Sequence, residues 1–161
     1  MARLQRVSPE GHAVHVMIKS NNRVTCFKSP VDYSAYMWWL REYSEKNGVE
    51  IHAWSLLKNH INLLCTPNIK GGLSRMIQSI GRQYVRFFNK RNKRTGTLWE
   101  GRFRSCLIQS DISILELYKY IELNPIRLNF VREAGDYKWS SYLINAEGNS
   151  SALCFPHKQY L

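Results

Sequence analysis

The chain has 161 residues, which is enough for one domain with its own hydrophobic core. Its formal net charge is +11, and this excess predicts a polyanionic partner, nucleic acid before an acidic membrane surface. Nine Tyr, six Phe and five Trp suit single-stranded nucleic acid, whose bases stack on aromatic rings. Composition alone leaves open a basic protein whose aromatic residues only form its core.

Several classes of protein are excluded by their missing motifs. The four cysteines are far apart and form no C-x-x-C pair, so we expect reduced cytosolic thiols and neither a zinc site nor a redox centre. Residues 1–12 lack a secretory signal and no stretch approaches about 18 apolar residues, so we expect a cytoplasmic protein without a membrane partner. Nothing resembles a P-loop, a Rossmann fingerprint or a G-x-S-x-G elbow, and no small-molecule cofactor is expected.

Apolar runs and helix signals divide the first half of the chain into four elements. The pattern predicts a strand at 12–18, a helix at 32–48, and strands at 49–57 and 60–66. Lys58 and Asn59 separate the last two strands as a two-residue hairpin turn, for which Asn59 tolerates a positive φ. The polar loop before the helix has room for a short strand at 24–27.

The second half is expected to hold two helices and a strand. The pattern predicts a helix at 71–94, a strand within 94–110 and a helix at 111–125. In the last helix Ser113 and Glu116 fit a capping box, and Pro125 predicts that the helix ends at Asn124. The order of elements favours an α+β fold in which helices pack on an antiparallel sheet.

A basic stripe follows the long helix. Arg75, Arg82, Arg86 and Lys93 fall within a narrow angle at about 100° per residue, so they face away from the core together. The stripe is either a solvated helix face or a surface for a phosphate backbone.

One histidine and one asparagine interrupt the apolar hairpin strand. His60, Asn62 and Leu64 share one side of the strand, and the hairpin register places Ala53 and Ser55 opposite the last two. These small residues leave room above that face, so a cation held by His60 Nε2 and the Asn62 oxygen is geometrically possible. A hydrogen-bonded structural pair is the alternative.

A second polar pair lies on the last helix. Tyr120 and Asn124 are four residues apart and project from one side, which suits a tyrosine nucleophile beside an amide oxygen. A packing role remains open for Tyr120, as for Tyr118. The other histidines have no ligand-like partners in the sequence and are read as structural: His12, His15, His52 and His157.

Four motifs occur in one order along most of the chain: NHINLL, RTGTLWEGRFRS, LYKYIELNPIRLNFV and DYKWSSY. With the opening GHAVHVMIKSNNR, they resemble the single-tyrosine HUH transposases, and among these the REP-associated tyrosine transposases of bacteria. The resemblance covers roughly residues 11–143. It implies a transposase-like domain at 1–145 and a C-terminal tail at 146–161, with a ferredoxin-like (RRM-like) antiparallel sheet of the HUH endonuclease type.

The resemblance also implies a site. The family's nucleophile falls on Tyr120, its first histidine ligand on His60 and its third ligand on Asn124, and these ligands bind Mg²⁺ or Mn²⁺. The family's second histidine falls on Asn62, whose oxygen is a hard donor that suits Mg²⁺. The implied partner is single-stranded DNA with REP-like palindromic hairpins, cleaved to a 5′-phosphotyrosine and a free 3′-OH by a monomer or a homodimer.

Basic residues are expected to hold the DNA phosphates without reading sequence. They are Arg75, Arg82, Arg86, Lys90, Arg91, Lys93, Arg94, Arg102 and Arg104.

Because Asn62 replaces a histidine, two functions stay open: a working metal-dependent nickase and a catalytically impaired protein that binds DNA hairpins. An RNA-binding domain of the RRM kind is disfavoured, because strands 49–57 and 60–66 lack its pattern of exposed rings.

Overall fold

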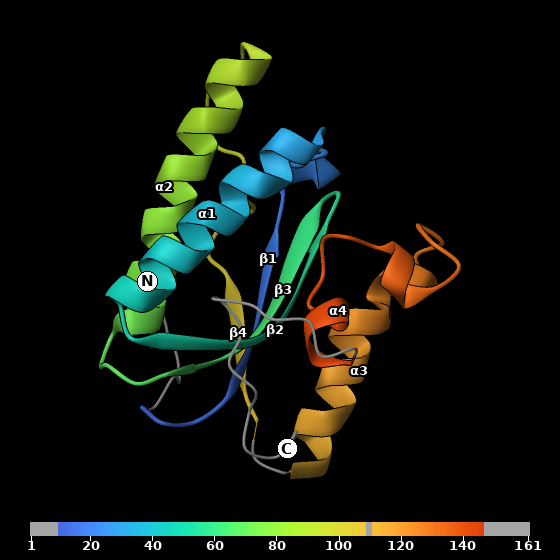
Figure 1. The fold of residues 1–161 in the computed structure, drawn as a ribbon. Coiled ribbons are helices and arrows are strands. Elements are labelled where there is room, and N and C mark those ends of the chain that lie inside the picture. The colour runs from blue at the N-terminus through green and yellow to red at the C-terminus, as the bar shows by residue number, and fades with distance from the viewer. Residues whose placement is uncertain (1–9, 109–110, 147–161) are drawn as a thin grey trace.

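A four-stranded antiparallel sheet forms the centre of the computed structural model, which describes residues 10–108 and 111–146 (Figure 1). The strands are β1 (Val14–Lys19), β2 (Val49–Leu57), β3 (His60–Pro67) and β4 (Arg104–Leu107). Their order in the sheet is β2-β3-β1-β4, with all neighbours antiparallel. This is the ferredoxin-like arrangement, and the predicted α+β fold is confirmed.

Helices cover both faces of this sheet. They are α1 (Pro30–Lys46), α2 (Gly72–Asn92), α3 (Asp111–Arg127) and the short α4 (Tyr142–Asn145), with single 3-10 turns at Asn21–Arg23 and Ala134–Asp136. Figure 1 shows α1 and α2 packed together on one face and α3 on the other. Helix α3 packs mainly on β2 and β3, so it covers chiefly that half of its face.

Strand β3 lies between two hydrophobic clusters. Ile61 and Leu63 face the larger cluster under α1 and α2, whereas Leu64 joins the cluster of α3 residues Tyr118 and Ile121. Both faces of the strand are buried, but its polar residues His60, Asn62 and Thr66 all lie on the α3 side. Asn62 is therefore fully buried although it is polar.

The predicted hairpin register is confirmed. Leu57 pairs with His60, Ser55 with Asn62 and Ala53 with Leu64, and the turn consists of two residues. The expected positive φ at Asn59 is wrong, since the described residues with positive φ do not include it. Tertiary bonds hold the turn instead: its backbone oxygens accept from the N–H groups of Ser20 and Cys26, at 2.9 and 2.7 Å.

The predicted start of α3 at Asp111 is confirmed, but its predicted cap and its predicted end are wrong. Because the helix begins at Asp111, Ser113 lies inside it and is not its N-cap residue. Pro125 lies inside the helix, which continues to Arg127 and does not end at Asn124. The proline falls in the last turn, where the helix soon ends anyway, and Leu128 N–H still donates to the Asn124 carbonyl at 3.0 Å.

Two further expectations concern irregular parts of the chain. Residues 24–27 form no strand, and they follow the 3-10 turn as loop. All of the expected tail 146–161 except Ala146 lies outside the described residues, and this part includes His157. Within the described ranges, no helix has the length and apolar character needed to cross a membrane.

Candidate active site

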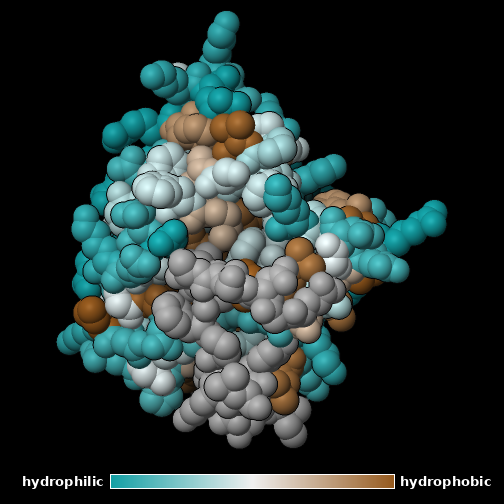
Figure 2. Space-filling model, in the orientation of Figure 1, coloured by the Kyte–Doolittle hydropathy of each residue, from teal (hydrophilic) through white to brown (hydrophobic). Residues whose placement is uncertain are grey.

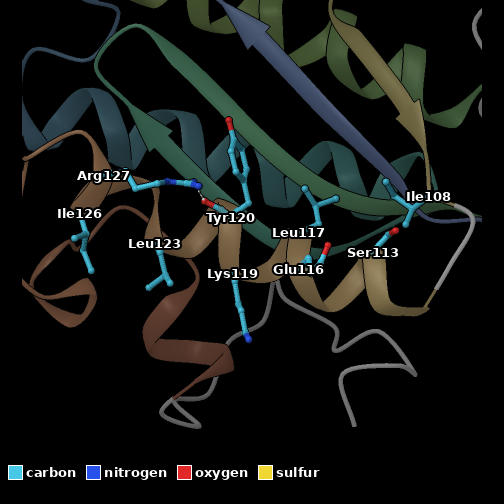
Figure 3. Close-up of a pocket in the computed structure, with 9 residues that line it drawn as sticks. All are labelled: Ile108, Ser113, Glu116, Leu117, Lys119, Tyr120, Leu123, Ile126 and Arg127. Carbon is cyan, nitrogen blue, oxygen red and sulfur yellow. Dashed lines mark hydrogen bonds between the residues drawn. The ribbon is translucent and has the colours of Figure 1, made fainter.

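Tyr120 stands on the side of α3 that faces the sheet. Its side chain points toward the strands, while Lys119 beside it points away (Figure 3). Tyr120 is 39% exposed, whereas Tyr118, two residues earlier, is a buried member of the α3 cluster. The sequence left a packing role open for both tyrosines. The helix gives them different surroundings, because residues two apart on a helix point in different directions.

The ring of Tyr120 lies against His15. The two ring centroids are 6.2 Å apart in an edge-on arrangement, and His15 Nε2 lies 3.0 Å from Asn62 Oδ1. His15 thus connects the helix tyrosine to the polar residue of β3. Burial lowers the pKa of His15, although its bond to Asn62 opposes this, so the ring is neutral at neutral pH.

His15, which we expected to be structural, lies between Asn62 and Tyr120 and contacts both of them. Its position follows from strand pairing, because β1 runs antiparallel to β3 with Met17 opposite Asn62 and His15 opposite Leu64. Residues of β1 and β3 are far apart in the chain, and no local pattern pairs them. The signal available in the sequence was a histidine in a short strand beside the His-x-Asn strand of a ferredoxin-like sheet.

Two buried polar atoms at this point of the sheet lack hydrogen-bond partners among the described residues. Asn62 Nδ2 and Ser55 Oγ are buried with no hydrogen bond to the described residues, and the two residues are paired across β2 and β3. A buried polar group without a partner costs about 1–3 kcal/mol. Native proteins rarely leave such groups unpaired, so these two atoms are the polar groups at this point of the sheet that could still accept a partner.

His60 begins β3 on the same side of the sheet. Its Nδ1 lies 2.8 Å from Asn59 Oδ1, so Nδ1 carries the proton and Nε2 keeps a free lone pair. Burial, and to a lesser extent the positive charge of Lys19, lowers the pKa of His60. A neutral imidazole whose other nitrogen donates to an oxygen has the usual form of a metal ligand.

Arg127 closes the site from the end of α3. Its guanidinium lies 4.1 Å from the centre of the Tyr120 ring, and it donates to the Tyr120 carbonyl and, at 3.3 Å, to Asn124 Oδ1. Asn124 is 5% exposed. Sequence reasoning missed Arg127, although its spacing of seven from Tyr120 places both on one face of a helix.

The donor types of the three expected ligands suit a divalent cation. His60 offers Nε2, the Asn124 oxygen accepts from Arg127, and the end of the Asn62 amide that is buried without a partner among the described residues is its nitrogen. Half a turn about the last side-chain bond would place the Asn62 oxygen at that end and its nitrogen on His15. Nitrogen and hard oxygen donors of this kind suit Mg²⁺ or Mn²⁺. The described residues contain no group of three or more His, Cys, Asp or Glu able to hold a metal, so two amides would have to complete the set.

The expected DNA-binding residues do not gather at Tyr120. All are exposed except Arg94, which is half-buried, and seven of them belong to α2 or the turn after it, across the sheet from α3. Figure 2 shows hydrophilic side chains at the top of the molecule, where α2 ends in Figure 1. Arg91 forms an ion pair with buried Asp32 at 3.4 Å, and Arg94 bonds to Asn89 at 2.6 Å, so these two also hold the fold.

Arg104 is the expected DNA contact that shares a sheet face with the site. It pairs with Met17 on β1, two residues from His15, and strand alternation turns both toward the α3 side. Arg104 and Lys19 are exposed on this face, outside the β2–β3 half on which α3 mainly packs. This half of the sheet is therefore a basic surface next to Tyr120.

A hollow of about 630 Å³ runs along α3 from Ile108 to Arg127 (Figure 3). It is lined largely by apolar side chains such as Leu117 and Leu123, and the Tyr120 ring forms part of its wall. The nucleophile candidate is thus reachable from solvent.

The fold and this site define the class: an α+β protein with a ferredoxin-like sheet that presents a tyrosine and a basic surface. A sequence model of the family described as IS200-like transposases matches residues 9–124, which is more than half of the chain. The chain belongs to this family, and it is therefore a DNA-processing enzyme of the transposase type. No curated protein matches it.

Solved structures agree with this fold. The chain is similar to a REP-associated tyrosine transposase bound to a REP hairpin, with a TM-score of 0.72, 18% identity, and 98% of this chain and 93% of that chain covered. It is also similar to a candidate transposase from Deinococcus radiodurans R1, with a TM-score of 0.51, 16% identity, and 75% and 96% covered. The predicted family resemblance is confirmed.

Proposed function

We propose that this transposase cleaves single-stranded DNA beside a hairpin, with Tyr120 as the nucleophile. The observation that carries the proposal is the position of Tyr120, an exposed tyrosine between the His15–Asn62 pair and the Arg127 guanidinium. The hairpin as partner is supported by the related fold that was solved bound to a REP hairpin.

The reaction is a transesterification. Tyr120 Oη attacks phosphorus, a tyrosine O–P bond forms, and the bond from phosphorus to the 3′ oxygen breaks. The phenol proton leaves to water and the departing 3′ oxygen takes up a proton. The products are a 5′-phosphotyrosine and a 3′-OH, and reversal rejoins the strand without ATP because one phosphoester replaces another.

Arg127 supplies positive charge at the point where negative charge develops. Its guanidinium lies over the Tyr120 ring, and such a cation stabilises both a phenolate and the oxygens of the attacked phosphate. Its bonds to the Tyr120 carbonyl and to Asn124 hold it there.

A Mg²⁺ or Mn²⁺ ion held by His60, Asn62 and Asn124 would polarise a non-bridging oxygen of the scissile phosphate. Asn59 keeps His60 in the tautomer whose Nε2 is free.

The strand to be cut is proposed to cross the β1–β4 half of the sheet, where Arg104 and Lys19 face the site side. The α2 stripe would hold a more distant part of the DNA, such as the hairpin stem, since it lies in the other layer. These contacts go to phosphates and set position without reading sequence.

Tyr120→Phe tests the proposal, with Tyr142→Phe as the matched control because Tyr142 lies on α4. Labelled single-stranded REP-like hairpins are incubated with Mg²⁺ and scored for a covalent protein–DNA adduct and for binding. We expect adducts from the wild type and the control, and none from Tyr120→Phe, which still binds hairpins. Adducts that persist in Tyr120→Phe would refute the nucleophile. Hairpin binding without any adduct in the wild type would identify the chain as the impaired binding protein, a function that the replacement of histidine by Asn62 supports.

A further inference from the structure

We infer that Trp38 on α1 stacks on an unpaired base in the loop of the bound DNA hairpin, while cations near the end of α2 hold the phosphates beside that base. The inference rests on the proposed function, from which it takes the hairpin as partner. It adds a second contact site, in the helix layer across the sheet from Tyr120.

The ring of Trp38 faces solvent. It is 59% exposed, more than any other large hydrophobic residue described, whereas its neighbours Met37 and Trp39 pack on the main core. Within the described ranges it has no hydrogen bond or ring contact. Val31, two helical turns earlier on the same face, is 51% exposed as well. Because tryptophan is highly buried on average, a ring left this free is available to a ligand.

The packing of α1 on α2 brings this ring to the basic stripe. Asp32 of α1 lies 3.4 Å from Arg91, and farther along α1 the hydroxyl of Tyr43 lies 3.4 Å from Gln83 Nε2. The two helices therefore run side by side in opposite directions (Figure 1). Trp38 lies between these two contacts.

Two cations of α2 lie at the same level and on the same outer face. Trp39 turns toward α2 and packs on Phe87, with ring centroids 5.7 Å apart. The preceding residues of the two helices, Trp38 and Arg86, are each turned by about 100° from this contact and are exposed. Lys90, one turn after Arg86, is exposed on the same side of α2.

Further positive charge gathers at this end of the helix layer. The charged groups of Lys28 and Arg94 lie 5.6 and 5.5 Å from the centre of the Phe88 ring. The exposed carboxylates of α1, Glu42 and Glu45, begin one turn beyond the tryptophan and lead away from the end of α2. The ring therefore borders a surface on which cations predominate.

An unpaired nucleotide fits this combination. Bases stack on exposed aromatic rings while neighbouring cations hold the backbone, and stacking tolerates any sequence. In a duplex stem the bases stack on one another and offer no free face, so the loop is the part of a hairpin that can use the ring. A second copy of this chain is disfavoured as the occupant, because each copy carries a formal charge of +11.

The test compares two DNA hairpins with the same stem. One has a loop of ordinary nucleotides, and the other has an abasic loop of equal length, which keeps the phosphates and removes the bases. Fluorescence anisotropy measures the binding of the wild type and of Trp38→Ala. Ile69→Ala is the matched control, since Ile69 is 48% exposed and lies before the start of α2, at the other end of that helix. Far-UV circular dichroism and melting confirm that each variant is folded.

We expect Trp38→Ala to bind the ordinary loop about 5- to 100-fold more weakly than the wild type, the range for one stacked base. It should bind the abasic hairpin as the wild type does. Trp38→Tyr keeps a ring and should recover most of the affinity, and Ile69→Ala should change neither hairpin.

Equal binding of the ordinary hairpin by the wild type and Trp38→Ala would overturn the inference. An equal loss with both hairpins would also overturn it, because the ring would then not act through a base. Sedimentation velocity of the DNA-free protein covers the other occupant: a dimer that Trp38→Ala dissociates would make this face an interface between copies.

The assay keeps this inference apart from the cleavage chemistry. A loop effect without any covalent adduct in the wild type would refute cleavage by Tyr120 and support the stacking site. A wild type that binds neither hairpin would overturn both the proposed partner and the inference.

Discussion

Glu122 is a buried carboxyl that lies between Tyr120 and Asn124 in the sequence of α3. It is 4% exposed, and its Oε2 accepts hydrogen bonds from Ser141 Oγ at 2.5 Å and Asn145 Nδ2 at 2.7 Å. Asn145 also donates to the His52 carbonyl at 2.9 Å. At the residue scale, this cluster ties α3, α4 and β2 together behind Tyr120.

The pH dependence of stability should report on this carboxyl. Burial raises the pKa of Glu122 above the ordinary 4.5, although its two hydrogen bonds oppose this. Between that value and the raised one, the folded state binds the proton more tightly than the unfolded chain. The free energy of unfolding should therefore fall as pH rises through this window, by at most about 1.4 kcal/mol per pH unit.

Glu122→Gln removes the titrating group, so urea unfolding from pH 4 upward should lose that part of its slope. A slope identical to that of the wild type would show that Glu122 does not titrate as inferred.

The described cysteines differ in reactivity. Burial raises the pKa of the Cys26 and Cys65 thiols to about 12, whereas Cys106 on β4 is exposed. Iodoacetamide at pH 8 should modify Cys106 much faster than Cys26 or Cys65, because the thiolate is the nucleophile and burial keeps the other two protonated. Peptide mapping of the native protein checks this, and comparable labelling of Cys26 or Cys65 would contradict the described packing.

At the scale of elements, the site depends on how α3 docks on the sheet. Ile114, Tyr118 and Ile121 pack on Ala53 and Leu64 in a small cluster of their own. The helix therefore holds Tyr120 through a small apolar interface, and a substitution in this cluster should displace the nucleophile as well as lower the stability.

Ile121→Ala should lower the free energy of unfolding by about 2–5 kcal/mol, since Ile121 is fully buried and its removal leaves a cavity. Leu115→Ala on the same helix is the control, because Leu115 is 42% exposed and its loss should change stability by less than about 0.5 kcal/mol. Denaturant unfolding measures both, and similar losses would mean that α3 is not docked as described.

At the scale of the whole molecule, positive charge occupies two layers. The α2 stripe lies across the sheet from Tyr120, and Arg104 lies on the site side. DNA that touches both the α2 stripe and Arg104 must pass around an edge of the sheet. Substitutions in the stripe and at Arg104 should therefore have separable effects on hairpin binding and on adduct formation.

The salt dependence of hairpin binding should separate them. For each phosphate that a variant no longer neutralises, the plot of log K against log salt should flatten by about 0.7 for a single strand and 0.9 for a duplex. We expect a flatter slope from Arg82→Gln with Arg86→Gln, with little change in adduct formation once DNA is saturating. Arg104→Gln should flatten the slope and also slow adduct formation.

Arg91 is unsuitable for this comparison, because its removal would leave buried Asp32 without its ion pair. Fluorescence anisotropy at several salt concentrations measures binding, and equal effects of both variants on adduct formation would refute the two-layer assignment.

Local patterns determined much of this protein. Helical and strand periods placed the elements of the sheet, the hairpin register was deducible from a two-residue turn, and the motifs around Tyr120 indicated the family. Such features depend on neighbours within a few residues, where backbone geometry leaves few choices.

Only the tertiary structure decided which residues of different elements come into contact. It brought His15 to Asn62, placed Arg127 over Tyr120, separated Tyr120 from core Tyr118, and put the α2 stripe on the far layer. It also carried α3 through Pro125, because the proline falls where the helix soon ends. These contacts join residues far apart in the chain, and they arise from sheet pairing and burial, which a local pattern does not contain.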